Sequence, residues 1–193
     1  MSKRLYVAYG SNLNFRQMKH RCPTAKLYGT GTIDGYELQF KGTPGSAYAT
    51  IAPKEDASVP VAVWEIAPQD ERSLDRYEGY PSHYFKKTVS VSLDGEDVDA
   101  MVYIMNPKMK FGMPSPYYYA TVLEGYCDCE LDTDVLDRAI KDSAQRYYYS
   151  AVGLSEQQTL FDYGDDEPEG SEEGFDEEPD ESDPFYFSDG MHL

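Results

Sequence analysis

A glutamate between aromatic residues is the side chain of this sequence best suited to proton transfer. Glu78 stands within residues 73–81, next to Tyr77 and Tyr80 and immediately before Gly79. Partial burial beside such rings raises the pKa of a carboxyl group toward neutral pH, where a general base works best. A single glutamate before a glycine is, however, most often an exposed residue at a helix end. Glu78 by itself leaves both interpretations open.

The second candidate is a turn of small polar residues that follows an apolar stretch. Residues 5–9 have the composition of a β-strand, and Gly10, Ser11 and Asn12 end it before residues 14–20, which can begin a helix. Gly10 permits backbone angles that other residues avoid, and Ser11 and Asn12 are favourable N-cap residues. Such a turn can direct several peptide N–H groups at one carboxylate or phosphate. The same pattern also occurs in tight turns that bind nothing.

The elements that must position these groups alternate strands with turns. Further strands are predicted over residues 25–33, 35–40, 48–52, 59–66, 84–93 and 98–105. The last two form a hairpin around Asp94-Gly95, and residues 41–46, 53–58 and 107–116 are predicted as loops or turns. Helices are predicted over residues 15–20, 69–78, 117–126 (ending at Gly125) and 132–147. The pattern indicates a mostly antiparallel sheet or barrel with a few helices, which is the α+β class.

Charge divides the chain into a nearly balanced body and an acidic tail. All 17 Lys and Arg residues lie at or before Arg146, so residues 1–146 carry a net charge of −3 and residues 147–193 carry −15. We therefore expect one domain over residues 1–150 and a disordered acidic tail over residues 151–193. The alternative is that the tail, with its aromatic cluster Phe185–Phe187, binds a protein partner. Its sign opposes nucleic-acid binding, which needs Lys and Arg against phosphate.

The remaining composition favours a cytoplasmic protein without a metal. No apolar run approaches the roughly 20 residues that span a bilayer, and no signal-peptide core follows the N-terminal charges. The three cysteines, Cys22, Cys127 and Cys129, make an odd number without Cys-x-x-Cys spacing, so we expect reduced thiols. A metal site would need His20 or His83 brought in from a distance, and none is expected.

Several short motifs follow one another in an order that carries a family resemblance. They are Tyr9–Leu13, Ala49–Ile51, Val61–Trp64, Leu74-Asp75 with Glu78-Gly79, Tyr84, Tyr103, and Pro114–Pro116 with Tyr118 and Gly125. Each is weak alone, but the Tyr-Gly-Ser-Asn turn and the Leu-Asp-x-x-Glu-Gly segment form a specific pair. On these residues the chain resembles the γ-glutamylcyclotransferase-like family, over residues 5 to about 145.

This resemblance implies a fold, a reaction and a set of site residues. The fold would be a small mixed, mostly antiparallel β-barrel flanked by helices. The reaction would convert a small-molecule γ-glutamyl amide into 5-oxoproline and a free amine, without metal or organic cofactor. Glu78 would be the general acid/base and the only catalytic residue carried over. The substrate-binding residues carried over are Tyr9, Gly10, Ser11, Asn12, Leu13, Tyr84, Tyr103 and Tyr118.

The roles within that set differ. The turn of residues 9–13 would hold the α-carboxylate of the glutamyl unit through its peptide N–H groups, and the tyrosines Tyr84, Tyr103 and Tyr118 would hydrogen-bond the substrate or Glu78. With 18 tyrosines in the chain, each of these three has packing as its alternative role.

Two departures from the family pattern concern the substrate. Ala62 stands where glycine is common, and Tyr48 replaces a small residue, so the resemblance fixes the reaction better than the amide that is cleaved. An inactive binding or adaptor protein of the same fold, using its acidic tail, is the alternative function. Both a monomer and a homodimer are compatible with the sequence.

Overall fold

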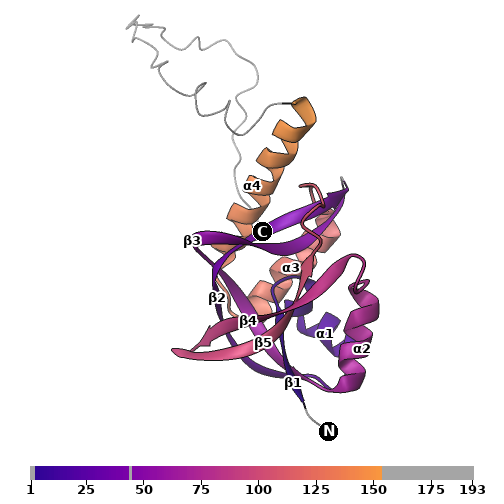
Figure 1. Cartoon of the computed structure of the whole chain (residues 1–193), viewed down its shortest axis with the longest axis vertical. Coiled ribbons are helices and arrows are strands. Elements are labelled where there is room, and N and C mark those ends of the chain that lie inside the picture. Colours follow the sequence, from indigo (N-terminus) through magenta and orange to yellow (C-terminus); the bar gives the residue numbers. More distant parts are fainter. Residues whose placement is uncertain (1–2, 44, 154–193) are drawn as a thin grey trace, which may run out of the picture.

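A closed β-barrel forms the centre of the part of the chain that the computed structural model describes, residues 3–43 and 45–153 (Figure 1). Its strands are β1 (Arg4–Ala8), β2 (Lys26–Thr43), β3 (Ser46–Ile66), β4 (Tyr84–Leu93) and β5 (Glu96–Met105). The strand order around the barrel is β1-β3-β2-β4-β5. Neighbouring strands are antiparallel except β1 and β5, which run parallel where the barrel closes. The predicted α+β class and mixed, mostly antiparallel barrel are therefore confirmed.

Helices surround this barrel, and polar side chains cap the start of several of them. They are the single 3-10 turn η1 (Ser11–Leu13) and the helices α1 (Phe15–Arg21), α2 (Pro68–Tyr77), α3 (Pro116–Asp128) and α4 (Thr133–Val152). The Asn14 side chain accepts a hydrogen bond from the Gln17 N–H at the start of α1, and Ser115 does the same for Tyr118 at the start of α3. In Figure 1, α4 rises from one end of the barrel and α2 lies along its side.

The alternation of buried and exposed residues shows which face of a strand packs against the core. Val89, Val91 and Leu93 of β4 are buried, and the residues between them are more exposed. By contrast, all residues from 59 to 64 in β3 are buried, because the barrel covers one face and other elements cover the other. Trp64, for example, packs edge-on against Phe15 of α1, with ring centroids 5.7 Å apart.

The long strands β2 and β3 correct the sequence prediction, which divided each of them in two. They pair with each other from Lys26↔Glu65 to Thr43↔Ser46, with register irregularities at Leu27/Gly29 and Asp34/Tyr36. Gly35 has φ +74° and lies in the second irregularity, so it marks a bulge and does not end the strand. The predicted turn over residues 53–58 and most of the predicted loop over residues 41–46 are likewise parts of this hairpin.

Gly125 does not end α3, as the sequence pattern predicted, but lies inside it. A Cβ atom at this position would lie 2.6 Å from the Asn14 nitrogen and 2.7 Å from the Leu13 Cβ. The missing side chain therefore lets α3 lie directly against η1. The helix continues to Asp128 because its packing against the turn outweighs the low helix propensity of glycine.

The predicted acidic tail, residues 151–193, falls almost entirely outside the described residues, which end at Gly153. Within the described ranges, no helix has both the length and the apolar character needed to cross a bilayer.

Candidate active site

The polar turn at the end of β1 is held by its own backbone and by close neighbours. The Leu13 N–H donates to the Gly10 carbonyl at 2.9 Å, which closes the 3-10 turn. Gly10 has φ −121°, so it is not in the left-handed region that favours glycine. Space is the constraint, because a Cβ there would lie 3.2 Å from both Ala49 Cβ and the Tyr118 hydroxyl.

Glu78 lies at the C-terminal end of α2 and points back toward this turn. Its N–H continues the helix by donating to the Leu74 carbonyl at 2.8 Å, and Gly79, with φ +62°, then turns the chain away. The Glu78 carboxylate accepts a hydrogen bond from the Asn12 side-chain amide at 3.1 Å. Burial raises the pKa of Glu78 to about 7, against the opposing effects of the Arg21 charge and the Asn12 hydrogen bond.

The Asn12 side chain joins Glu78 to two residues that the sequence did not indicate. The amide nitrogen of Asn12 donates both to Glu78 and, at 2.8 Å, to the hydroxyl of Tyr6 on β1. The amide oxygen accepts from the Arg21 guanidinium at 2.5 Å. The two hydrogen bonds that the amide nitrogen donates, and the one that the amide oxygen accepts, fix which way the amide faces. Asn12 therefore orients the Glu78 carboxylate and links it to a positive charge.

Arg21 is held in place at the end of α1 by contacts on both of its sides. Its guanidinium also donates to the Ser11 hydroxyl at 3.0 Å and to the Gln17 side chain at 3.0 Å. Its central carbon lies 3.7 Å from the centroid of the Tyr77 ring, a cation–π arrangement. No motif marks Arg21 in the sequence, because it becomes part of the site only when α1 folds back beside the turn.

Two of the tyrosines that the sequence analysis singled out use their hydroxyl groups for structure. The Tyr84 hydroxyl donates to the Ala49 carbonyl at 3.1 Å, and the Tyr103 hydroxyl donates to Asp75 Oδ1 at 2.6 Å. Burial is the main cause that raises the pKa of both phenols. Their rings line the site, but their hydroxyl protons are engaged elsewhere.

Tyr118 differs from these two because its hydroxyl accepts hydrogen bonds from backbone. The Ala49 N–H donates to it at 3.2 Å, and the Ser11 N–H is a second backbone donor. Burial nevertheless raises the pKa of Tyr118, so the phenol stays protonated. A hydroxyl that accepts from backbone in this way still has a proton to donate.

Two hollows meet at Glu78. The inner recess has a volume of about 30 Å³, which is enough for one or two water molecules or a carboxylate. The residues that line it are Tyr6, Tyr9, Gly10, Ser11, Asn12, Ala49, Glu78, Tyr84, Tyr103 and Tyr118. A larger outer hollow of about 500 Å³ shares Glu78, Tyr84 and Tyr118 with it. A ligand bound at this junction would have one part in the inner recess and the rest in the outer hollow, with Glu78 beside the bond that joins them.

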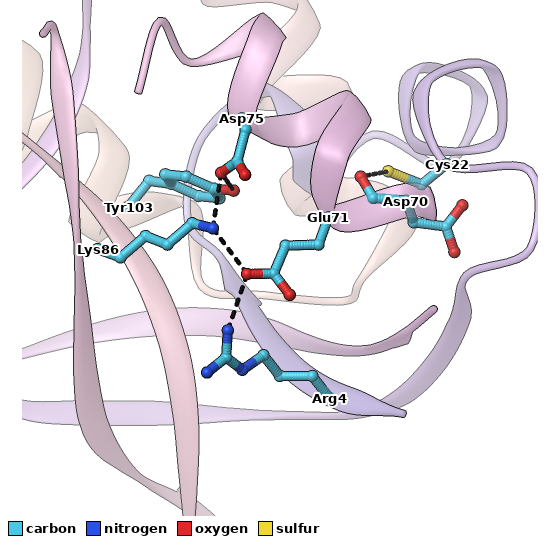
Figure 2. Close-up of polar contacts among 7 residues, drawn as sticks. All are labelled: Arg4, Cys22, Asp70, Glu71, Asp75, Lys86 and Tyr103. Carbon is cyan, nitrogen blue, oxygen red and sulfur yellow. Dashed lines mark hydrogen bonds and ion pairs between the residues drawn. The ribbon is translucent and has the colours of Figure 1, made fainter. Parts of the chain in front are cut away.

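Ion pairs hold α2, and thereby Glu78, against the barrel. Figure 2 shows the Lys86 ammonium of β4 between the carboxylates of Glu71 and Asp75, at 2.6 and 2.7 Å. Arg4 of β1 contacts the same Glu71 oxygen at 2.8 Å, and the Tyr103 hydroxyl contacts Asp75. Three barrel strands therefore fix the face of α2 that precedes Glu78.

The structure brings together all the predicted site residues except Leu13. Tyr9, Gly10, Ser11, Asn12, Glu78, Tyr84, Tyr103 and Tyr118 all line the inner recess. The Leu13 side chain is instead fully buried in the core, and its N–H is used within η1. In the described part of the chain, no three His, Cys, Asp or Glu side chains are placed to hold a metal ion, and the three cysteines are free thiols.

Comparison with known proteins identifies the family that has this arrangement. The sequence model of the family described as Gamma-glutamyl cyclotransferase, AIG2-like matches residues 6–120, a range that includes the turn, Glu78 and the listed tyrosines of the recess. The chain belongs to this family.

Named relatives agree with membership of the γ-glutamyl cyclotransferase family. The gamma-glutamylcyclotransferase of Bos taurus is 30% identical over 130 residues, which cover 63% of this chain and 69% of the relative. The gamma-glutamylcyclotransferase of Homo sapiens is 28% identical over the same shares of the two chains. The prediction of an enzyme of the γ-glutamylcyclotransferase type is confirmed at this level.

Solved structures agree in fold. One named Gamma-glutamyl cyclotransferase has a TM-score of 0.66 at 24% identity and covers 72% of this chain and 86% of its own. YkqA from Bacillus subtilis has a TM-score of 0.64 at 18% identity and covers 75% of this chain and 55% of its own. At these identities the likeness establishes the barrel fold alone.

Proposed function

We propose that this chain cyclises the γ-glutamyl group of a small γ-glutamyl amide to 5-oxoproline and releases a free amine, with Glu78 as general acid/base. Residues 1–150 would carry this activity, and residues 151–193 would be an appendage to it. The observation that carries the proposal is a carboxylate with a pKa of about 7, held by Asn12 where the inner recess meets the outer hollow.

The reaction needs a group that both takes and returns a proton. The α-amine of the glutamyl unit is an ammonium at neutral pH, and only its deprotonated form can attack the γ-carbonyl carbon. One ammonium proton is lost to solvent to give this form, and Glu78 takes a second proton from the nitrogen as the new C–N bond closes the five-membered lactam. It then returns that proton to the amide nitrogen as the original C–N bond breaks, and the released amine takes up one proton from solvent. No water is consumed, and a pKa near 7 suits both steps at neutral pH.

Positioning supplies the other part of the rate enhancement. We propose that the α-carboxylate lies in the inner recess, whose volume suits a group of that size, and is bound by peptide N–H groups of the turn. The Tyr118 hydroxyl, which accepts from backbone, would donate its proton to the substrate. Holding the amine close to the carbonyl makes the intramolecular attack the favoured conformation. Within this scheme Leu13 serves only to close the turn.

A panel of γ-glutamyl amides tests the proposal. Incubation with the full-length chain should release 5-oxoproline from at least one member, measured by mass spectrometry. Glu78→Gln keeps the size and the hydrogen bond to Asn12 but removes the base, and should lower the turnover by at least about a hundredfold. Equal product from the Gln variant would exclude Glu78 as the base. No product across the panel would contradict the cyclisation itself.

A further inference from the structure

A third hollow, the α1 groove, lies between helix α1 and the strands β2 and β3. Its volume is about 310 Å³, at the lower limit of sites that hold whole small molecules. No residue that lines this groove also lines the inner recess or the outer hollow. The α1 groove is therefore separate from the proposed active site.

The α1 groove exposes apolar side chains that lie next to one another. Phe15 of α1 is 39% exposed and Leu27 of β2 is 43% exposed, and both belong to the lining. Trp64 of β3 completes this part of the wall, with its ring edge-on to Phe15. Exposed apolar side chains gathered around a hollow mark a surface that binds another apolar group.

The helix beside the groove is basic. Lys19 is the only charged residue of the lining, and α1 also carries Arg16, His20 and Arg21 but no acidic residue. Lys19 is exposed and forms no salt bridge within the described part of the chain. Arg16 makes only a long contact of 3.9 Å with Glu124. An apolar group flanked by carboxylates would complement this groove in both shape and charge.

A segment of the chain that lies outside the described residues has this chemistry. Phe185, Tyr186 and Phe187 follow one another, with Asp183 before them and Asp189 after them. This is the only run of three aromatic residues in the range 154–193, a range without any Lys or Arg. Aromatic rings between carboxylates match an apolar groove beside a basic helix.

The length of chain between α4 and this segment is sufficient for it to reach the groove. Residues 154–184 form a connection of 31 residues. A chain of that length spans up to about 100 Å when extended and about 30 Å on average as a random coil. A domain of 150 residues is only about 40 Å across. Tethering also gives the segment an effective concentration in about the millimolar range, so weak contacts are enough for docking.

We infer that residues 183–189 dock in the α1 groove of their own chain, with the aromatic rings against Phe15 and Leu27 and the carboxylates beside Lys19. This interaction is independent of the proposed cyclisation. Because the groove shares no residue with the recess or the outer hollow, docking covers an exposed apolar surface and leaves the proposed active site open.

Zero-length cross-linking of the full-length chain tests the inference. A water-soluble carbodiimide joins a lysine amine to a carboxylate only where the two are in contact, and peptide mass spectrometry then locates the new amide. In dilute solution the main product formed by the C-terminal segment should join Lys19 to Asp183 or Asp189 of the same chain.

Two double substitutions in the full-length chain form a matched pair. Phe185→Ser with Phe187→Ser removes two rings from the docking segment. It should lose most of the cross-link to Lys19 and shift the emission of Trp64, the only tryptophan, to longer wavelength, because Trp64 lines the groove. Phe161→Ser with Tyr163→Ser removes two rings elsewhere in residues 154–193 and should change neither measurement.

Four results would overturn the inference. The carboxylates could react equally with Lys19 and with exposed lysines such as Lys108 and Lys110, or the Lys19 cross-link could survive Phe185→Ser with Phe187→Ser. Products confined to Lys41, which lines the outer hollow, would place the segment over the proposed active site instead. In a mixture of isotope-labelled and unlabelled protein, products that join only different chains would assign the groove to a second copy. None of these measurements depends on catalysis, so their failure would leave the cyclisation untouched.

Discussion

Replacing Arg21 with glutamine tests whether a positive charge, relayed by one asparagine, lowers the pKa of the proposed base. Arg21 contacts one end of the Asn12 amide at 2.5 Å, and Glu78 contacts the other end at 3.1 Å. Burial raises the pKa of Glu78 to about 7, and the Arg21 charge opposes that rise. Loss of the charge should therefore move the pKa further upward.

The size of this shift follows from the geometry. The two contacts and the amide between them put the guanidinium and the Glu78 carboxylate no more than about 8 Å apart. At an effective dielectric constant of about 20, unit charges at that distance attract by about 2 kcal/mol, or about 1.5 pKa units. Because Arg21 is partly exposed, solvent screening reduces the expected shift to about one unit.

The assay is the pH dependence of kcat/KM for 5-oxoproline release, compared between variants on one substrate. The acidic limb, where Glu78 becomes ionised, should move from about pH 7 to about pH 8 in Arg21→Gln. Activity at pH 7 should fall about fivefold and recover at higher pH. Arg21→Lys keeps the charge and should leave the limb near its original position. A limb that stays at the same pH in Arg21→Gln would refute the electrostatic role of Arg21.

Two further predictions concern the same site. Glu78 has a folded-state pKa of about 7 against an ordinary value of 4.5, so ionising it costs the folded state stability as pH rises through this interval. The free energy of unfolding of Glu78→Gln, measured by denaturant titration, should consequently exceed that of the parent by about 1–3 kcal/mol at pH 8 and equal it at pH 4. A difference in the free energy of unfolding that does not depend on pH would contradict the assigned pKa. Gly10→Ala should raise KM severalfold without moving the acidic limb, since the new methyl group crowds Ala49 and Tyr118 at 3.2 Å. Gly29→Ala is its control, because a Cβ there meets only Leu93, at 3.9 Å; equal KM values in the two variants would argue against binding at the turn.

Local sequence patterns predicted the short elements well and the long strands poorly. The β4–β5 hairpin was correct because its alternation and its Asp-Gly turn depend on neighbouring residues alone. β2 and β3 continue through Gly35 and Asp56, both at positive φ, because pairing along the whole hairpin accommodates these irregularities. Gly125 was misjudged for a related reason, since its role depends on α3 lying against η1. Contacts between segments that are far apart in the chain produce no periodic pattern in the local sequence, so local patterns did not predict them.

The same distinction applies to the site. The turn and Glu78 were proposed from the sequence because each lies in a short motif, and the family resemblance joined them. Tyr6 and Arg21 were missed, since their contacts with Asn12 form only when the chain folds and neither lies in a recognisable motif. The hydroxyl partners of Tyr84 and Tyr103 could not be foreseen either, because those partners lie on other elements.

The position of β1 has a consequence for how the protein loses activity. This strand pairs on one side with β3 and on the other with β5, and the Tyr-Gly-Ser-Asn turn follows directly from it. Amides of a strand that is paired on both sides and buried are expected to exchange with solvent mainly when the barrel opens. The turn is thus tied to a strand that is paired on both sides. On heating, catalysis and the cooperative unfolding transition should disappear together, with no inactive but folded species in between.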